Sequence, residues 1–179
     1  MKNKAMSNIR KAEKRDFDNI FSIIEESFPA DEYRDYDDHK RLFDRSAFTI
    51  YVIPDDEEQS IKAFITLWEF DDFAYIEHFA VSQKYRNQGL GGELLNYLVK
   101  NLNGTVCLEV EPPVTKTAKR RIGFYERNGF TLNEYPYIQP AFSKDKKPVE
   151  LMIMTANGKV SKEEFELIKS TLYKEVYKV

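Results

Sequence analysis

The sequence has few of the residues that build disulfides and metal sites. Its single cysteine, Cys107, cannot form an intramolecular disulfide, which suits the reducing cytoplasm. Its only histidines are His39 and His78, and no cysteine and histidine set has the spacing typical of metal ligands. We therefore expect a cytoplasmic protein that holds no metal.

Long apolar runs and an excess of basic charge are also missing. No apolar run reaches the roughly 18 residues that a membrane span needs. The first six residues include lysines, but no apolar segment follows them, so they do not resemble a signal peptide. The net charge of −3 offers no basic surface for nucleic acid or for an anionic membrane. We expect neither as a partner.

The remaining composition describes a globular protein. With 179 residues, the chain is long enough for one domain with a sizeable core. Its 42% hydrophobic and 32% charged residues are typical of a soluble folded protein and not of a disordered one. No internal repeat or linker is visible, so we expect a single domain over residues 1–179.

Hydrophobic periodicity predicts the order of helices and strands. Strands are expected at 8–13, 47–53, 61–70, 74–81, 105–111, 130–138 and 149–155, and helices at 16–28, within 31–45, and at 89–101, 115–127 and 161–177. This order predicts an α+β fold with a mixed, mostly antiparallel sheet flanked by helices. The core covers about 8–155, and the last helix is an addition to it.

In the strand expected at 74–81, we expect successive side chains to alternate strictly between the two faces of the sheet. Tyr75, Glu77 and Phe79 fall on one face, and His78 falls on the other. A histidine on an apolar strand is more often a core residue than a ligand, so we expect His78 to be structural. Glu77 lies in too apolar a run to be an idle surface glutamate.

A glycine-rich segment follows this strand and begins the next helix. Gly89, Gly91 and Gly92 carry no Cβ atom, so backbone N–H groups can approach a ligand closely. These N–H groups belong to a helix N-terminus, which favours an anion such as a pyrophosphate. The segment lacks the Gly-Lys-Ser/Thr of a P-loop and the G-x-G-x-x-G of a dinucleotide fold.

The segment does match R-x-x-G-x-G through Arg86, Gly89 and Gly91. This pattern resembles the acyl-CoA-binding segment of the GNAT superfamily of N-acetyltransferases, in which the loop holds the pyrophosphate and the preceding strand binds the pantetheine arm. The resemblance implies acetyl-CoA as acyl donor. The contacts that it assigns are Phe79, Ala80, Val81, Arg86, Asn87, Gln88, Gly89, Leu90, Gly91, Gly92 and Tyr125.

Two further motifs follow in the order of that family. Leu108-Glu109-Val110 resembles its L-E-V strand, and the segment from Tyr125 to Phe130 resembles its Y-E-x-x-G-F. The resemblance covers about 8–155 and implies a GNAT-like domain.

The chain also departs from the family pattern at the second helix of the resemblance. Ala118 replaces a common asparagine, Arg121 replaces a usual alanine, and Pro112-Pro113 lengthens the entry. We therefore assign no cofactor contact to the first turn of this helix on the basis of the resemblance. The basic residues of this helix are either ligands of the CoA 3′-phosphate or a solvated face.

The resemblance implies acetyl transfer from acetyl-CoA to a primary amine of a small molecule or peptide by direct attack. It assigns Tyr125 as the acid that protonates the leaving thiolate. The backbone N–H of Phe79 or Ala80 is the candidate donor to the attacked carbonyl. Either Glu77 or Glu109 is the base, with a slight preference for Glu77. Cys107 has no basic neighbour in the sequence, so we expect a buried structural thiol.

Aromatic residues outside the core elements are candidates for acceptor binding. These are Tyr33, Tyr36, Tyr135 and Tyr137. Acidic neighbours of the first two suit a cationic amine, although loop packing explains the same residues. Rival interpretations are an acyl-CoA-binding module without turnover and a protein-interaction module that uses the C-terminal helix. Whether the protein forms a homodimer is left open.

Overall fold

The computed structural model describes residues 8–179. The N-terminal residues that were compared with a signal peptide lie outside the described residues. Within the described part of the chain, no helix is long and apolar enough to cross a membrane.

A seven-stranded sheet forms the centre of the molecule, in the order β1-β2-β3-β4-β5-β7-β6. Neighbouring strands are antiparallel except for β4 and β5, which are parallel. The strands are β1 (Arg10–Lys11), β2 (Phe48–Asp55), β3 (Ser60–Glu69), β4 (Phe73–Val81), β5 (Thr105–Val110), β6 (Phe130–Gln139) and β7 (Val149–Ala156). The mixed, mostly antiparallel sheet is confirmed.

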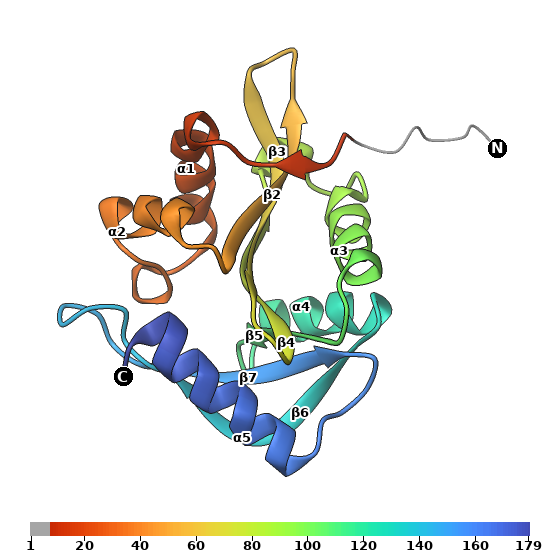
Figure 1. Cartoon of the computed structure of the whole chain (residues 1–179). Helices are drawn as coiled ribbons and strands as arrows, with labels where there is room; N and C mark the ends of the chain where they lie inside the picture. The colour runs from red at the N-terminus through yellow and green to blue at the C-terminus, as the bar shows by residue number, and fades with distance from the viewer. Residues whose placement is uncertain (1–7) are drawn as a thin grey trace.

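Helices cover both faces of this sheet (Figure 1). Figure 1 shows α1 and α2 on one side of β2 to β4 and α3 on the other, with α5 crossing the lower end beside β6 and β7. The helices are α1 (Phe17–Ser27), α2 (Tyr36–Lys40), α3 (Leu90–Asn101), α4 (Lys116–Arg127) and α5 (Lys162–Thr171), with short turns η1 (Lys14–Asp16), η2 (Ala30–Glu32), η3 (Arg41–Asp44), η4 (Gln83–Tyr85) and η5 (Leu172–Tyr177).

Each face of the sheet has its own apolar core. One core joins Phe17 and Ile24 of α1 to Phe165 of α5, and the other joins Leu94 of α3 to Ile122 of α4. Within each helix the apolar residues recur at helical spacing on the face that packs on the sheet, which explains why the sequence predicted the helices. The expected helix within 31–45 is shorter than its range, because η2, α2 and η3 divide it.

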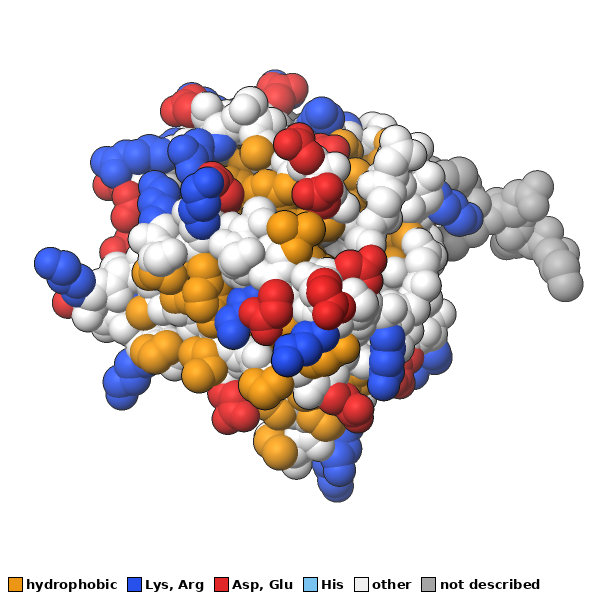
Figure 2. Space-filling model, turned by 60° about the horizontal axis from the view of Figure 1, so that its bottom comes forward, with side chains coloured by type: hydrophobic (Ala, Val, Ile, Leu, Met, Phe, Trp, Pro, Cys, Tyr) orange, Lys and Arg blue, Asp and Glu red, His pale blue; other side chains and the backbone are white. Residues whose placement is uncertain are grey.

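The C-terminal helix packs on its own chain. Phe165, Ile168, Leu172 and Val176 are each at most 3% exposed and join the core of α1. The apolar stripe is therefore not available to a partner, which corrects the hypothesis that it serves protein interaction. Figure 2, which turns the lower end of the molecule forward, shows apolar side chains in small groups among acidic and basic ones.

Strand β4 does not alternate regularly, because a bulge interrupts it. Thr66 of β3 faces His78, whereas the next residue, Leu67, faces Ile76, so Glu77 is the extra residue. An extra residue shifts all later side chains to the opposite face.

The bulge corrects the expected faces of this strand. Tyr75 belongs to the core on the α1 side, whereas Phe79 packs against the core on the α3 side. Glu77 and His78 were expected on opposite faces, yet His78 Nδ1 lies 3.9 Å from Glu77 Oε2. A bulge has no reliable signal in a single sequence, and only the pairing with β3 reveals it.

Candidate active site

Strands β4 and β5 pair only as far as Ile76 and Leu108 and then separate. Strand β5 continues beside β7, and β4 continues beside β3. A cavity of about 790 Å³ lies where they part. Its walls come from both strands, from the start of α3 and from α4. Parallel strands that part in this way leave backbone groups without a strand partner, which is where a ligand can pair with the edge.

The backbone of β4 presents specific N–H groups to this space. The N–H of Ser82 donates to Lys62 O of the β3 side at 2.9 Å. Because N–H groups along a strand alternate between its edges, that of Ala80 also points to β3. The N–H groups of Phe79 and Val81 point the other way, toward the gap. Of the two candidate donors to the attacked carbonyl, Phe79 is therefore favoured.

The glycine-rich loop has the backbone conformation that its composition predicted. Gly89 has φ of 81° and Asn87 has φ of 63°, both in the left-handed region. Helix α3 begins at the following residue, Leu90, so its first N–H groups face the cavity without helical partners. Arg86 Nε donates to the carbonyl of Val81 at 3.2 Å, which fixes the loop to the end of β4.

Gly91 is required by close packing at the same place. A Cβ atom there would lie 3.1 Å from Phe79 Cζ and 3.3 Å from a methyl of Val81. Only glycine lets α3 begin so close to β4, and this closeness builds the wall of the cavity. The cradle fits the pyrophosphate and pantetheine of an acyl-CoA, whose anionic end needs free N–H groups and whose arm needs an open strand edge.

The cavity brings together most of the residues that the sequence assigned to it. The expected residues that line it are Glu77, Phe79, Ala80, Val81, Arg86, Asn87, Gly89, Leu90, Gly91, Gly92, Glu109 and Tyr125. Gln88 belongs to the same loop but is not among the lining residues. Of the basic residues on α4, Arg120, Arg121 and Arg127 line the cavity. They offer positive charge near the loop.

Tyr125 occupies the last turn of α4 and faces the cavity. It is 7% exposed, and its ring packs against Phe79 with centroids 6.3 Å apart. Burial raises the pKa of Tyr125 to about 12, and the positive charge of Arg121 opposes this only in part. The hydroxyl is therefore protonated at neutral pH, as a proton donor must be.

Glu77 is held in a buried ion pair. Its side chain is 1% exposed, Oε1 accepts from Arg34 Nη1, and Oε2 accepts from Trp68 Nε1 at 3.1 Å. Burial favours the neutral acid, but the charge and hydrogen bond of Arg34, with the neighbouring histidines, lower the pKa of Glu77 to about 2. Such a carboxylate is a weak base.

Glu109 is surrounded by phenols, and no cation among residues 8–179 lies beside it. Tyr75 donates to Oε2 at 2.8 Å, Tyr177 lies 3.0 and 2.9 Å from the two oxygens, and Tyr137 donates to Oε1. Burial raises the pKa of Glu109 to about 7, although the three hydroxyls lower it and the charge of Glu77 adds to the increase. A carboxyl with this pKa can accept a proton near neutral pH.

Several residues of this site carry no sequence signal. Arg34 pairs with Glu77 across 43 positions, and Tyr177 reaches Glu109 across 68. Tyr177 belongs to the helix that lies outside the family resemblance, so the C-terminal segment completes the surroundings of Glu109. In the sequence, only the glutamate of the L-E-V strand indicated that hydrogen-bond donors would be needed there, because a buried carboxylate requires them.

The four tyrosines expected to bind the acceptor do not line the cavity. Tyr33 and Tyr36 pack edge-on against Phe21, with centroids 5.9 and 5.1 Å apart, and Tyr135 packs against Phe165. Tyr137 approaches the cavity only through Glu109. Loop and core packing thus explains the first three, and the predicted acceptor set has no support from this cavity.

Acidic residues from α1, from η2 and from the segment after β5 also line the cavity. Glu26, Glu32 and Glu111 are among its lining residues. Burial and the charge of Glu111 raise the pKa of Glu32, while Arg121 opposes the shift. Glu111 also forms an ion pair with Arg121 Nη1 at 3.5 Å. Carboxylates in the wall of a cavity disfavour anions and attract a cation.

Cys107 lies in β5 and is 0% exposed. Burial, with the charge of Glu109, raises the pKa of its thiol well above the usual value. The thiol is therefore not a nucleophile, as expected.

Comparisons with known proteins agree with this architecture. A family model described as "Acetyltransferase (GNAT) family" matches residues 10–130. YjbC of Bacillus subtilis (strain 168), an acetyltransferase by name, is 35% identical over 115 residues; the match covers 63% of this chain and only 56% of YjbC.

Two solved structures share the fold. One, described as a GNAT-family acetyltransferase from Bacteroides thetaiotaomicron, is 35% identical with a TM-score of 0.83 and coverage of 96% of this chain and 99% of that one. NAA60 of Arabidopsis thaliana, solved in complex with acetyl-CoA, is 16% identical with a TM-score of 0.64 and coverage of 84% and 98%, a likeness of fold alone. The chain belongs to the acetyltransferase (GNAT) family.

Proposed function

We propose that this protein transfers an acetyl group from acetyl-CoA to a primary amine that is cationic in solution, on a small molecule or a peptide. The observation that carries the proposal is the cavity between β4 and β5. It has free N–H groups of a helix start at one end and a glutamate with a pKa near 7 in its wall.

The proposed donor site uses the loop and the open edge of β4. The first N–H groups of α3, with Arg120 nearby, would hold the phosphates of acetyl-CoA, and the backbone of Val81 would pair with the pantetheine arm. This places the thioester beside Phe79, whose N–H points toward the gap and would stabilise the oxygen as it gains charge.

Glu109 is the proposed base. An alkyl ammonium with a pKa near 10 holds its proton at neutral pH, so the amine must lose it before attack. Glu109 takes this proton, directly or through water, because its pKa of about 7 leaves it substantially ionised there. Glu77 is less suited, since its ion pair with Arg34 lowers its pKa to about 2. The slight preference for Glu77 in the sequence is thus reversed.

The remaining steps need one acid. The neutral amine attacks the carbonyl carbon of the thioester, and the C–S bond breaks as the C–N bond forms. Tyr125 donates its phenolic proton to the departing sulfur and regains a proton from solvent. The nitrogen releases its remaining extra proton, so that the products are the amide, free CoA and one proton.

The acceptor is proposed to enter the cavity along the wall that Glu26, Glu32 and Glu111 line. Their negative charge attracts an ammonium group and repels carboxylate-bearing substrates. Acceptors with a second positive charge are favoured over neutral amines for the same reason.

The proposal is tested by mixing the full-length protein with acetyl-CoA and a panel of amines and amino-terminal peptides, and by measuring thiol release. Diamines are expected to react faster than monoamines of equal length, and amino acids with a free carboxylate slowest. Calorimetry with acetyl-CoA alone is expected to show binding in wild type and in Glu109→Gln. Binding without turnover of any amine would instead identify an acyl-CoA-binding module.

A further inference from the structure

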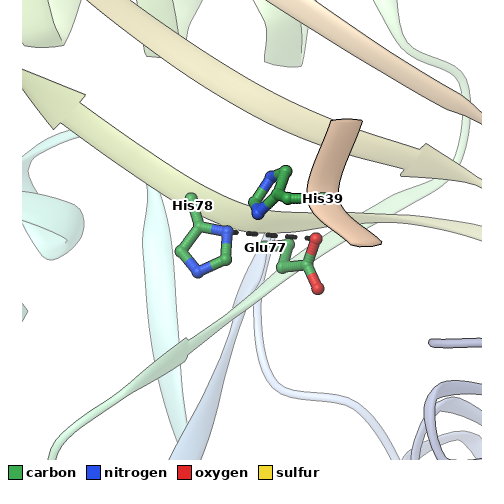
Figure 3. Close-up of side chains that lie close together, drawn as sticks. All are labelled: His39, Glu77 and His78. Carbon is green, nitrogen blue, oxygen red and sulfur yellow. Dashed lines mark ion pairs between the residues drawn. The ribbon is translucent and has the colours of Figure 1, made fainter. Parts of the chain in front are cut away.

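His39, Glu77 and His78 meet on the α1 side of the sheet, although their positions in the sequence do not predict it. One potential ligand atom of each lies within 4.8 Å of the corresponding atoms of the other two. Figure 3 shows His39 reaching from α2 toward Glu77 and His78, which lie side by side on the β4 bulge. The two histidines are 0% and 2% exposed, and the Glu77 side chain is 1% exposed.

Three nitrogen atoms of this cluster lack hydrogen-bond partners. Both ring nitrogens of His39 and Nδ1 of His78 are buried and unpaired among residues 8–179. Leaving a buried polar group unpaired is unfavourable, so a ligand that pairs with these nitrogens would be stabilising. Each of these unpaired ring nitrogens is a potential ligand atom for a metal ion.

The partners around the cluster orient these side chains. His78 Nε2 lies 2.8 Å from the carbonyl oxygen of Glu32 and donates to it, which leaves the lone pair of Nδ1 directed at the cluster. The carboxylate of Glu77 accepts from Trp68 Nε1 at 3.1 Å and from Arg34. Metal-binding histidines and carboxylates are held by outer partners of these kinds.

We propose that His39, Glu77 and His78 together bind one divalent transition-metal ion, with Zn²⁺ the best suited. Two neutral imidazoles and one carboxylate match the ligand preference of Zn²⁺, Co²⁺ and Ni²⁺, whereas Mg²⁺ and Ca²⁺ prefer oxygen ligands alone. The cation of Arg34 beside Glu77 repels any metal ion, so an ion that gains little from nitrogen does not bind.

Binding requires a small contraction of the cluster. Donors at about 2.1 Å from a tetrahedral ion lie roughly 3.4 Å from one another. The ligand atoms, now within 4.8 Å, must therefore approach by about 1 Å. Small rotations of the three side chains achieve this, and the bound ion would tie α2 to the β4 bulge. Glu77, His78 and Glu32 all line the cavity, so the tie fixes this part of its wall.

The decisive measurement uses the full-length, tag-free chain and Zn²⁺ alone. The chain contains two histidines, so every imidazole signal in a long-range ¹⁵N–¹H spectrum belongs to the proposed site. Before addition, one histidine should show the tautomer protonated at Nε2, as the contact of His78 with Glu32 requires. One equivalent of Zn²⁺ should shift the unprotonated nitrogen of both rings and raise the melting temperature, whereas Mg²⁺ should do neither.

Two variants provide matched controls. His39→Phe keeps an aromatic ring among Phe17, Phe21 and Phe48, and should weaken Zn²⁺ binding by about 100-fold or more because a direct ligand is lost. Asp44→Asn removes a carboxylate that is 68% exposed, pairs with Lys14 and is not one of the three ligands, and should leave the affinity unchanged. Equilibrium dialysis with metal analysis gives both affinities and the stoichiometry.

Imidazole signals that do not move in excess Zn²⁺ would overturn the proposal. Retained affinity in His39→Phe would also overturn it. If that variant does not fold, the wild-type spectrum decides alone. The measurement needs no acetyl-CoA and no amine, so its outcome is independent of the proposed acetyl transfer.

Discussion

Glu77 on β4 and Glu109 on β5 are two buried glutamates on adjacent strands, but they differ in what they contact. Arg34 holds Glu77 as a permanent anion with a pKa of about 2. Among the described residues, only tyrosines donate hydrogen bonds to the Glu109 carboxylate. They stabilise the anion less than a cation does, and its pKa is about 7.

The comparison shows how the type of partner decides the role of a buried carboxylate. An ion pair makes a glutamate structural, because its proton affinity becomes too small for a base at neutral pH. Neutral donors leave the affinity in the useful range while fixing the geometry.

Replacing Glu109 by Gln removes the proposed base. We expect kcat/KM at pH 7 to fall by about 100–10,000-fold and to recover partly at pH 9–10, where solution deprotonates the amine. The wild-type profile should rise with pH through an apparent pKa near 7. Initial rates between pH 5 and 10 measure both. A flat loss across this range would show that Glu109 only supports the structure.

Glu109→Gln, which lowers activity, should raise stability relative to wild type as the pH rises. The pKa of Glu109 is raised on folding, from 4.5 to about 7, so its contribution is present below pH 4.5 and is lost as pH rises through 7. Glutamine does not ionise, so Glu109→Gln does not lose this unfolding free energy as the pH rises. Relative to wild type, it should therefore gain up to about 3 kcal/mol of unfolding free energy between pH 5 and pH 8. Urea denaturation at the two pH values tests the sign.

Tyr125→Phe separates the acid from the base. We expect kcat to fall by roughly 10–1000-fold with little change in acetyl-CoA affinity, because the hydroxyl acts when the thiolate leaves. Unlike that of Glu109→Gln, this loss should persist at pH 9–10. Calorimetry and steady-state rates provide the two readouts, and a Phe variant with wild-type kcat would assign Tyr125 to packing.

Glu77→Gln tests the structural member of the pair. The change leaves the buried Arg34 cation without its partner, so we expect the unfolding free energy to fall by about 3 kcal/mol. Adding Arg34→Met should restore part of this loss, because no buried charge remains. The kcat of the folded protein should fall less than in Glu109→Gln. A larger fall than that would return the role of base to Glu77.

Tyr177→Phe removes one of the hydroxyls that contact Glu109 and should have the smallest effect. Losing a donor to the anion raises the pKa of Glu109, so the pH profile should move to higher pH and the rate at pH 7 should drop by about 2–10-fold. Tyr173→Phe is the matched control, since its hydroxyl donates to the carbonyl of Ile138 and not to Glu109. Equal shifts in both variants would contradict the role of Tyr177.

Residues that are close together in the sequence determined the glycine-rich loop, most helices and strands, and the fold. Gly89 and Gly91 predicted the glycine-rich loop, and the structure shows why glycine is needed at each position. Gly89 has a left-handed φ of 81°, and a Cβ atom on Gly91 would lie 3.1 Å from Phe79 Cζ. Periodic leucines and isoleucines predicted most helices and strands, and the order of the motifs predicted the fold. These features depend on residues that are neighbours along the chain.

The tertiary structure alone decided the chemistry of the carboxylates. The bulge at Glu77 depends on the register with β3, the ion pair depends on Arg34 from a distant loop, and the phenols around Glu109 include Tyr177 from the far end of the chain. A pKa follows from burial and from the charges and donors within a few ångströms. Since those neighbours are assembled by folding across 43 or 68 positions, a single sequence identifies the glutamates but not which of them can accept a proton.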